Sequence, residues 1–425
     1  MRRLSRMVEW RSESSARVPV APWVALVVVF LAGMRGLVYR VRLQFGDVTG
    51  SFLDDRPTQV VLHVLYAVVL LVGLGAFPRV GRARIDGRVL MSLGSLCGVL
   101  VLSTAWSIDR GRTLNQSLLF VVGSAAAVLL VSRLSVGQVL GALLAATSSA
   151  VVLSVVAAAL DWEISTDRRG RLTGIFYNRN ALGLVASLML LSALLWWWHE
   201  RGDSRVRVVA PLLAVTAIVV WWRSGSATSM IAVVAAVVAA AWLVMLVRAA
   251  GALRRLLAWM PAVLVVIVVA AVVWREWFAD LIGRDATFTG RTSTWGLVID
   301  TWARRPIVGF GYFAGWFDPE LRRGLREIGY NHWEAHNGYL EVILGAGVLG
   351  AVALGWFVVE VGRSLWRSVD REGAPIWLAA FVFALVSNIG ETNIGPNRLA
   401  WSVLVVASIA AATRRGSTVP LSTAD

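Results

Sequence analysis

The sequence predicts an all-α, polytopic membrane protein, and three features support this class: its hydropathy, its low charge content and its long apolar runs. Of the 425 residues, 57% are hydrophobic and only 16% are charged, and the mean hydropathy is +0.69. A soluble chain of this length could not bury so much apolar surface in a core. We therefore exclude a soluble enzyme and expect membrane lipids, with no nucleic acid, as partners.

The basic residues of the chain are all arginine. The 41 Lys+Arg include no lysine and outnumber the 26 acidic residues, which gives a net charge of +15. A guanidinium group stays charged and binds phosphate through two parallel hydrogen bonds. This composition suits anionic lipid headgroups or diphosphates. The single cysteine, Cys97, excludes a disulfide framework and a cysteine-based metal site.

Twelve apolar runs approach the length of about 17–25 residues that crosses the hydrocarbon core. We predict transmembrane helices at 22–39, 57–77, 88–106, 114–132, 136–160, 180–198, 208–222, 226–247, 256–274, 335–362, 375–393 and 397–413. The seventh and eighth spans are separated only by Arg223-Ser224-Gly225. If these two spans were one helix, every later loop would change sides.

The arginine distribution predicts that both termini are cytoplasmic, because arginine is enriched in cytoplasmic loops. With this orientation the cytoplasmic segments hold 21 arginines and the short outer loops hold 11. The predicted organisation is a cytoplasmic tail at 1–21, spans one to nine at 22–274, a large extracytoplasmic loop at 275–334, spans ten to twelve at 335–413 and a cytoplasmic tail at 414–425. No internal repeat is apparent.

The large outer loop is predicted to contain two short amphipathic helices that lie on the outer leaflet. In the stretch Ser293–Trp302, Trp295 and Val298 share one helical face with Trp302. Asp318-Pro319 is typical of an N-cap and first turn, and it predicts a second helix.

His336 is the candidate catalytic residue, since a titratable imidazole at the start of the tenth span suggests chemistry at the membrane surface. A lone histidine at a helix start more often caps or packs. His332 lies four residues earlier, so a helix would place both rings on one face, as in a metal site. However, His-x-Glu-x-His differs from the metalloprotease pattern His-Glu-x-x-His. We therefore expect neither a metal nor another cofactor.

Arginines of the outer loops form a second candidate group. A single outer arginine is usually a solvated charge or a headgroup contact. Several around one cavity would bind a diphosphate and stabilise it as a leaving group without a metal ion. The candidates are Arg171, Arg179, Arg223 and Arg291.

Three segments resemble those of a known family. His336-Asn337 is followed after nine residues by Gly347-Val348-Leu349-Gly350. This pattern resembles the His-Asn/Ser/Gln-x9-Gly-x-x-Gly/Thr/Tyr signature of the O-antigen ligase and Wzy polymerase superfamily of membrane glycosyltransferases. Gly290-Arg291 with Trp295, followed by Pro306–Gly311, is similar to a segment of the family's large outer loop.

The third segment, Arg171–Gly183, is similar to the family's Arg-x-x-Gly-x-Phe-x-Asn-Pro-Asn-x-x-Gly stretch. It departs from that stretch at Asn178-Arg179-Asn180, where arginine replaces proline. A second departure is Arg223, which precedes Ser224, whereas the family has serine before arginine.

The resemblance implies transfer of a glycan from a polyprenyl-diphosphate carrier (undecaprenyl or decaprenyl) to the hydroxyl of a glycan or lipid acceptor, at the outer face of the cytoplasmic membrane. His336 would deprotonate or orient that hydroxyl, the four candidate arginines would hold the diphosphate, and apolar grooves would hold the prenyl chain. Asn337, Tyr339, Gly347 and Gly350 would support the motif. Polysaccharide-assembly proteins are expected partners.

Two alternatives stay open at this point. A lipid-linked oligosaccharide flippase would also need many spans and cavity arginines, but it would place ionisable residues within the spans and show inverted repeats. Ligase and polymerase differ only in the acceptor, so the residues do not separate them.

Overall fold

The computed structural model describes residues 20–34, 56–75, 84–162, 165–167, 169–176, 178–261, 291–330, 332–371 and 373–414. These ranges are mostly helical, which confirms the predicted all-α class. Their two strands are β1 (Arg84–Ile85) and β2 (Thr413–Arg414), which pair antiparallel. Residues 1–19 and 415–425 of the predicted tails, the ninth predicted span beyond residue 261 and the start of the outer loop at 275–290 lie outside the described residues.

Most predicted spans coincide with an apolar helix. These helices are α2 (Val20–Ala32), α4 (Arg56–Gly75), α5 (Gly87–Leu102), α6 (Arg110–Val131), α7 (Val136–Ala159), α8 (Arg179–His199), α9 (Ser204–Ser224), α10 (Ala227–Arg248), α15 (Gly338–Arg367), α16 (Ala374–Gly390) and α17 (Leu399–Ala412). Within the described ranges, seven helices are long and apolar enough to cross a membrane, and four are shorter and apolar. The chain is therefore a multi-pass membrane protein, while the count of twelve spans stays a prediction.

The seventh and eighth predicted spans are separate helices, α9 and α10. Gly225 separates them with a left-handed backbone (φ 61°), and its N–H donates to the carbonyls of Trp221 and Trp222 at the end of α9. A glycine in this conformation is a common helix terminator, because it has no Cβ to clash.

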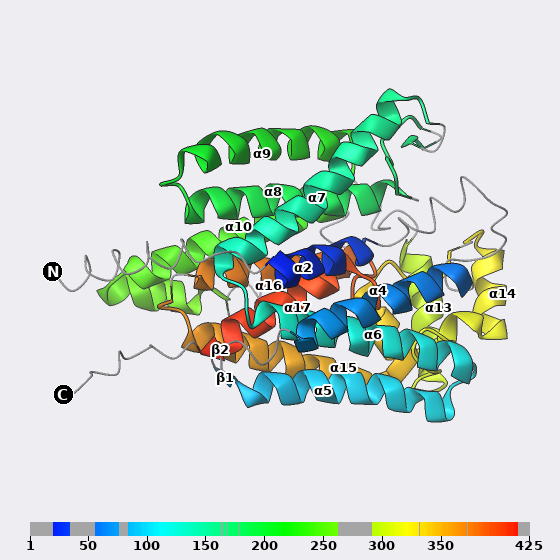
Figure 1. The fold of residues 1–425 in the computed structure, drawn as a ribbon. Helices are drawn as coiled ribbons and strands as arrows, with labels where there is room; N and C mark the ends of the chain where they lie inside the picture. Colours follow the sequence, from blue (N-terminus) through cyan, green and yellow to red (C-terminus); the bar gives the residue numbers. More distant parts are fainter. Residues whose placement is uncertain are drawn as a thin grey trace, which may run out of the picture.

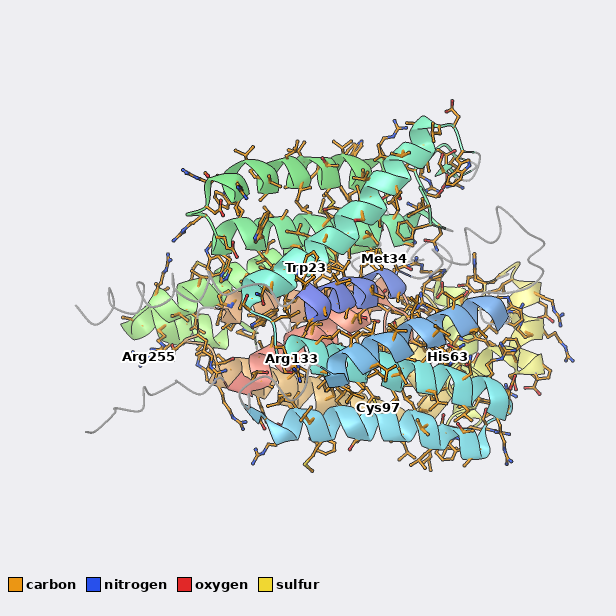
Figure 2. All side chains as sticks on the ribbon, in the orientation of Figure 1. Trp23, Met34, His63, Cys97, Arg133 and Arg255 are labelled. Atoms are coloured by element: carbon orange, nitrogen blue, oxygen red, sulfur yellow. The ribbon has the colours of Figure 1, made fainter. Side chains whose placement is uncertain are left out.

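The helices form a bundle whose two ends differ (Figure 1). α17 lies inside the bundle, and residues 399–409 are all buried. α9 lies at one edge and exposes apolar side chains such as Val208 and Trp222, as expected for a lipid-facing helix. The β1–β2 pair lies at one end, whereas α13 (Arg291–Ala303) and α14 (Pro319–Glu327) lie at the other. Arg255, which falls in a loop predicted to be cytoplasmic, lies at the end opposite α13 and α14 (Figure 2).

α13, α14 and the short 3-10 helix η4 (Gly315–Phe317) form a small lid. As predicted, Asp318 caps α14 by accepting from the N–H of Leu321, and Pro319 follows. The lid has its own apolar cluster, which contains Val298, Phe310, Trp316, Leu321, Leu325, Ala335 and Leu344. The apolar sides of these helices pack against each other and against α15, and their position on the outer leaflet stays a prediction.

α15 is broken at Gly347, which has φ 60° and ψ −155°. The break frees backbone groups that the segment Pro306–Gly311 satisfies. The N–H groups of Phe310 and Gly311 donate to the carbonyls of Leu344 and Gly345 at 3.0 and 2.8 Å. In return, the N–H groups of Val348 and Leu349 donate to the carbonyls of Pro306 and Ile307 at 2.8 and 3.2 Å. This exchange anchors the lid and leaves these backbone groups paired, as an apolar environment requires.

Candidate functional site

His336 lies in the turn that joins the lid to α15. The residues just before α15 are not helical, so the prediction that the tenth span begins at residue 335 is wrong by three residues. His336 itself has a left-handed backbone (φ 49°), which is costly for a residue with a Cβ and is typical of functional sites. Asn337 holds the turn as the N-cap of α15, accepting from the N–H groups of Tyr339 and Leu340.

The imidazole of His336 contacts two carboxylates. Its Nδ1 lies 3.1 Å from Oε2 of Glu391 and 3.7 Å from Oε1 of Glu334. The His336 residue is 9% exposed. With the proton on Nδ1, which we assign from this hydrogen bond, Nε2 carries the lone pair. This is the tautomer that a general base needs.

Opposing effects act on the pKa of His336. Burial lowers it, but the hydrogen bond to Glu391 and the negative charges of Glu334 and Glu391 raise it, and the net direction is upward. The neighbouring His332 shows the opposite direction, because burial and the charge of His336 lower its pKa. Of the two histidines, the environment makes His336 the stronger base.

Glu391 connects the histidine to an arginine. Its Oε2 faces His336, while its Oε1 accepts from Nη2 of Arg291 at 3.1 Å and from Nδ2 of Asn180 at 2.7 Å. Arg291 also donates to the carbonyl of Gly390. One carboxylate therefore fixes the candidate base and a candidate diphosphate ligand relative to each other.

Two further arginines lie close to this group. Arg171 forms an ion pair with Asp167, with Nη2 2.7 Å from Oδ2. Although burial acts to raise the pKa of Asp167, its hydrogen bonds with Arg171 lower it to about 2. Arg179 donates to the carbonyls of Ser224 and Gly225 and lies within the electrostatic range of Arg171, Arg291 and Glu391. Three of the four candidate arginines thus gather around one place.

Arg223 is less closely connected to this place. Arg223 is exposed, and its backbone carbonyl accepts from the N–H of Leu172 at 3.0 Å. Tyr339 donates to the carbonyl of Leu385 at 2.9 Å, in α16. Gly347 and Gly350 lie further along α15, and a Cβ on Gly347 would come within 2.3 Å of the carbonyl oxygen of Ile307. The two glycines therefore support the fold that holds the histidine.

Sequence reasoning missed Glu391, Asn180 and the ion pair between Arg398 and Glu334, whose atoms Nη2 and Oε2 are 2.7 Å apart. Glu391 was not recognised as a site residue because it fell inside the predicted span 375–393, whereas α16 ends at Gly390. The signal was the polar run from Glu391 to Asn393 between two apolar segments. Since acids rarely occur in spans without a function, Glu391 could have been identified.

A metal site is not supported by the described geometry. The rings of His332 and His336 lie 5.7 Å apart in an edge-to-face contact, and no helix aligns them. Within the described ranges, no group of three or more His, Cys, Asp or Glu side chains could hold a metal ion.

The fold and the site define a multi-pass membrane protein with a buried histidine, carboxylates and arginines beside a small folded lid. Residues 212–355 match the O-antigen ligase family. The matched segment contains the second part of α9, α10, the lid and His336, and it confirms the resemblance to the O-antigen ligase and Wzy polymerase superfamily. No curated protein matches the chain.

Proposed function

We propose that the protein is a metal-independent membrane glycosyltransferase that moves a glycan from a polyprenyl-diphosphate carrier to an acceptor hydroxyl. The family match supports a ligase role of this general kind. The observation that carries the proposal is the position of Glu391 between His336 and Arg291. This arrangement places a base for an acceptor beside cations for a departing diphosphate.

His336 acts on the acceptor. Its Nε2 accepts the proton of the attacking hydroxyl, and the carboxylates of Glu391 and Glu334 stabilise the imidazolium that forms. Because Glu391 fixes Nδ1, the ring has one orientation and one tautomer at the start of the reaction.

Arginines act on the donor. As the bond between the anomeric carbon and the phosphate oxygen breaks, negative charge accumulates on the diphosphate. Arg291, Arg179 and Arg171 stabilise this charge, and the Asp167 and Glu391 ion pairs hold two of them in place beforehand. The acceptor oxygen forms the new bond to the anomeric carbon, and the proton of the acceptor hydroxyl moves to His336. The polyprenyl diphosphate leaves with the electrons of the broken bond.

The described site favours group transfer over transport. A flippase would place ionisable residues within the spans, along the path of its substrate. Here the lid contacts the turn that carries the base, because Nε1 of Trp295 on α13 donates to the carbonyl of Ala335 at 2.9 Å, and Arg291 begins the same helix. We propose that this end faces the outside of the cytoplasmic membrane, where polysaccharide-assembly proteins would supply or remove glycan.

Purified protein with one defined lipid-linked glycan would test the proposal. Offering a second lipid-linked glycan or a separate lipid as the acceptor would distinguish polymerase from ligase activity. We expect a transfer product that persists in excess chelator. If the product disappears with chelator and returns with Zn²⁺ or Mg²⁺, metal independence is wrong. If wild-type protein forms no product with either acceptor but moves the lipid between leaflets, the chain is a flippase.

A further inference from the structure

Glu341 is a buried carboxylate that the proposed transfer chemistry leaves unused. It lies in the first turn of α15, and the residue is 3% exposed. Burial of a carboxylate is costly unless hydrogen-bond donors satisfy its oxygens, and acids within spans are rare without a function. The hydrogen-bond partners of Glu341 therefore indicate what it does.

Three donors from three separate segments converge on the two oxygens of this carboxylate. Oε2 accepts from Nε1 of Trp316 in the lid at 2.7 Å. Oε1 accepts from the N–H of Ala335 at 2.7 Å and from the hydroxyl of Thr392 at 3.2 Å. Ala335 directly precedes His336, and Thr392 directly follows Glu391. One carboxylate thus joins the neighbour of the candidate base to the neighbour of the base's own carboxylate partner.

The turn that carries His336 needs such support because its backbone is strained. The φ of His336 is 49°, and a residue with a Cβ keeps this conformation only where its surroundings hold it. Ala335 is held on both sides, since its N–H donates to Glu341 and its carbonyl accepts from Nε1 of Trp295 at 2.9 Å. Asn337 holds the other end of the turn as the N-cap of α15. Loss of the bond to Glu341 would release one side of the turn and let the imidazole rotate.

We propose that Glu341 is a positioning residue, which holds Ala335 and Thr392 so that His336 faces Glu391. A glutamate that only anchored the lid would need the bond to the lid tryptophan and neither of the other two. The same carboxylate therefore links the lid to the alignment of the base. This inference rests on the proposed function for the reaction that the alignment serves, whereas the alignment itself is present without substrate.

NMR of protein with isotope-labelled histidine tests the alignment without any transfer activity. The chain has four histidines, so the His336 signals can be assigned by their absence in His336→Ala. Burial and the charge of Arg291 lower the pKa of His336, whereas the hydrogen bond to Glu391 and the charge of Glu334 raise it, and the net direction is upward. If Glu341→Gln lets the imidazole leave Glu391, the measured pKa should fall by about 0.5–1 pH unit. The tautomer with the proton on Nδ1 should also lose its dominance.

Two further variants separate alignment from a direct charge effect and from lost stability. Thr392→Val removes a hydroxyl that bonds Glu341 but keeps the carboxylate, so it should lower the pKa of His336 by a smaller amount in the same direction. Glu360→Gln is the matched control, because Glu360 is also a buried glutamate of α15 but pairs with Arg363 near the other end of the helix. It should leave the His336 titration unchanged even if it lowers thermal stability. An unchanged His336 titration in Thr392→Val and in folded Glu341→Gln, or an equal shift in Glu360→Gln, would overturn the positioning role. If Glu341→Gln does not fold, Thr392→Val alone decides.

Transfer assays separate this role from the proposed function. Glu341→Gln should lower kcat by about 10–10²-fold, since a small misplacement of a catalytic group has this effect. The acidic limb of its kcat profile should move to lower pH, because a base with a lower pKa stays neutral at lower pH. A loss of rate with the acidic limb in place would show that Glu341 only stabilises the fold, and the inference would be wrong. A shifted His336 titration with no transfer product from the wild type would leave the positioning role supported and the glycosyltransferase function wrong.

Discussion

Nδ1 of His336 lies 3.1 Å from Oε2 of Glu391, although 55 residues separate them in the sequence. The two residues come from turns at the same end of the bundle, one before α15 and one after α16. Because the same carboxylate also holds Arg291, a change at Glu391 should affect both the base and the diphosphate site.

Replacement of the histidine is the first prediction. His336→Ala should reduce the transfer rate by roughly 10²–10⁴-fold, the usual contribution of a general base. Membrane insertion and thermal stability should stay near those of the wild type. His332→Ala is the matched control and should matter much less, because of the two histidines it is His336 that bonds Glu391. Full transfer by His336→Ala in a purified assay would remove this histidine from the mechanism.

The pH dependence of transfer gives the second prediction. A general base works when neutral, so activity falls as the pH drops through its pKa. Glu391 raises the pKa of His336. Glu391→Gln should therefore lower that pKa, move the acidic limb of the kcat profile to lower pH and reduce the maximal rate.

Glu391→Asp is the control for this shift, because it retains the negative charge. Its acidic limb should stay near that of the wild type even if the shorter side chain lowers the rate. An acidic limb that stays in place in Glu391→Gln would show that the titrating group is not His336.

Much of the fold could be predicted from the sequence, because a lipid environment requires long apolar helices. The site could be predicted only in part. The motif residues His336, Arg171 and Arg291 were identified, but their arrangement depends on tertiary contacts. Glu391 was assigned to a span because apolar neighbours outweighed it in the hydropathy pattern. The break at Gly347 was also missed, because this part of the chain is apolar on both sides. The backbone groups that the break frees are bonded by Pro306–Gly311, about forty residues away in the sequence.

The third prediction concerns the arginines. Arg291→Ala and Arg171→Ala should weaken both donor binding and turnover, because a diphosphate contact exists in the ground state and strengthens as the bond breaks. Arg→Lys at either position should restore activity only in part, since an ammonium group lacks the bidentate fork. Arg223→Ala is the control, because its side chain is exposed. Unchanged donor affinity and turnover in both Ala variants would contradict a diphosphate clamp.

The fourth prediction concerns membrane orientation. Ser293 is exposed on α13 in the lid, and we expect the lid to face outward. In a chain with Cys97→Ala, Ser293→Cys should react with an impermeant thiol reagent in intact cells. Ser417→Cys, in the predicted cytoplasmic tail, should react only after lysis. The reverse labelling pattern would invert the topology and place the site inside the cell.

The last prediction tests how the lid is anchored. Gly347 has a positive φ that side chains rarely adopt, and a Cβ there would overlap the carbonyl oxygen of Ile307. Gly347→Ala should cost roughly 1–3 kcal/mol of unfolding free energy from backbone strain alone, and the overlap should also push Pro306–Gly311 away from α15.

Gly355→Ala is the matched control on the same helix, because a Cβ there meets nothing within 4 Å. Thermal unfolding in detergent should show a loss for Gly347→Ala and no loss for Gly355→Ala. Transfer by Gly347→Ala should fall as well, because the lid contacts the turn that carries His336 through the hydrogen bond from Trp295 to Ala335. Equal stability of the two variants would mean that the exchanged hydrogen bonds do not anchor the lid.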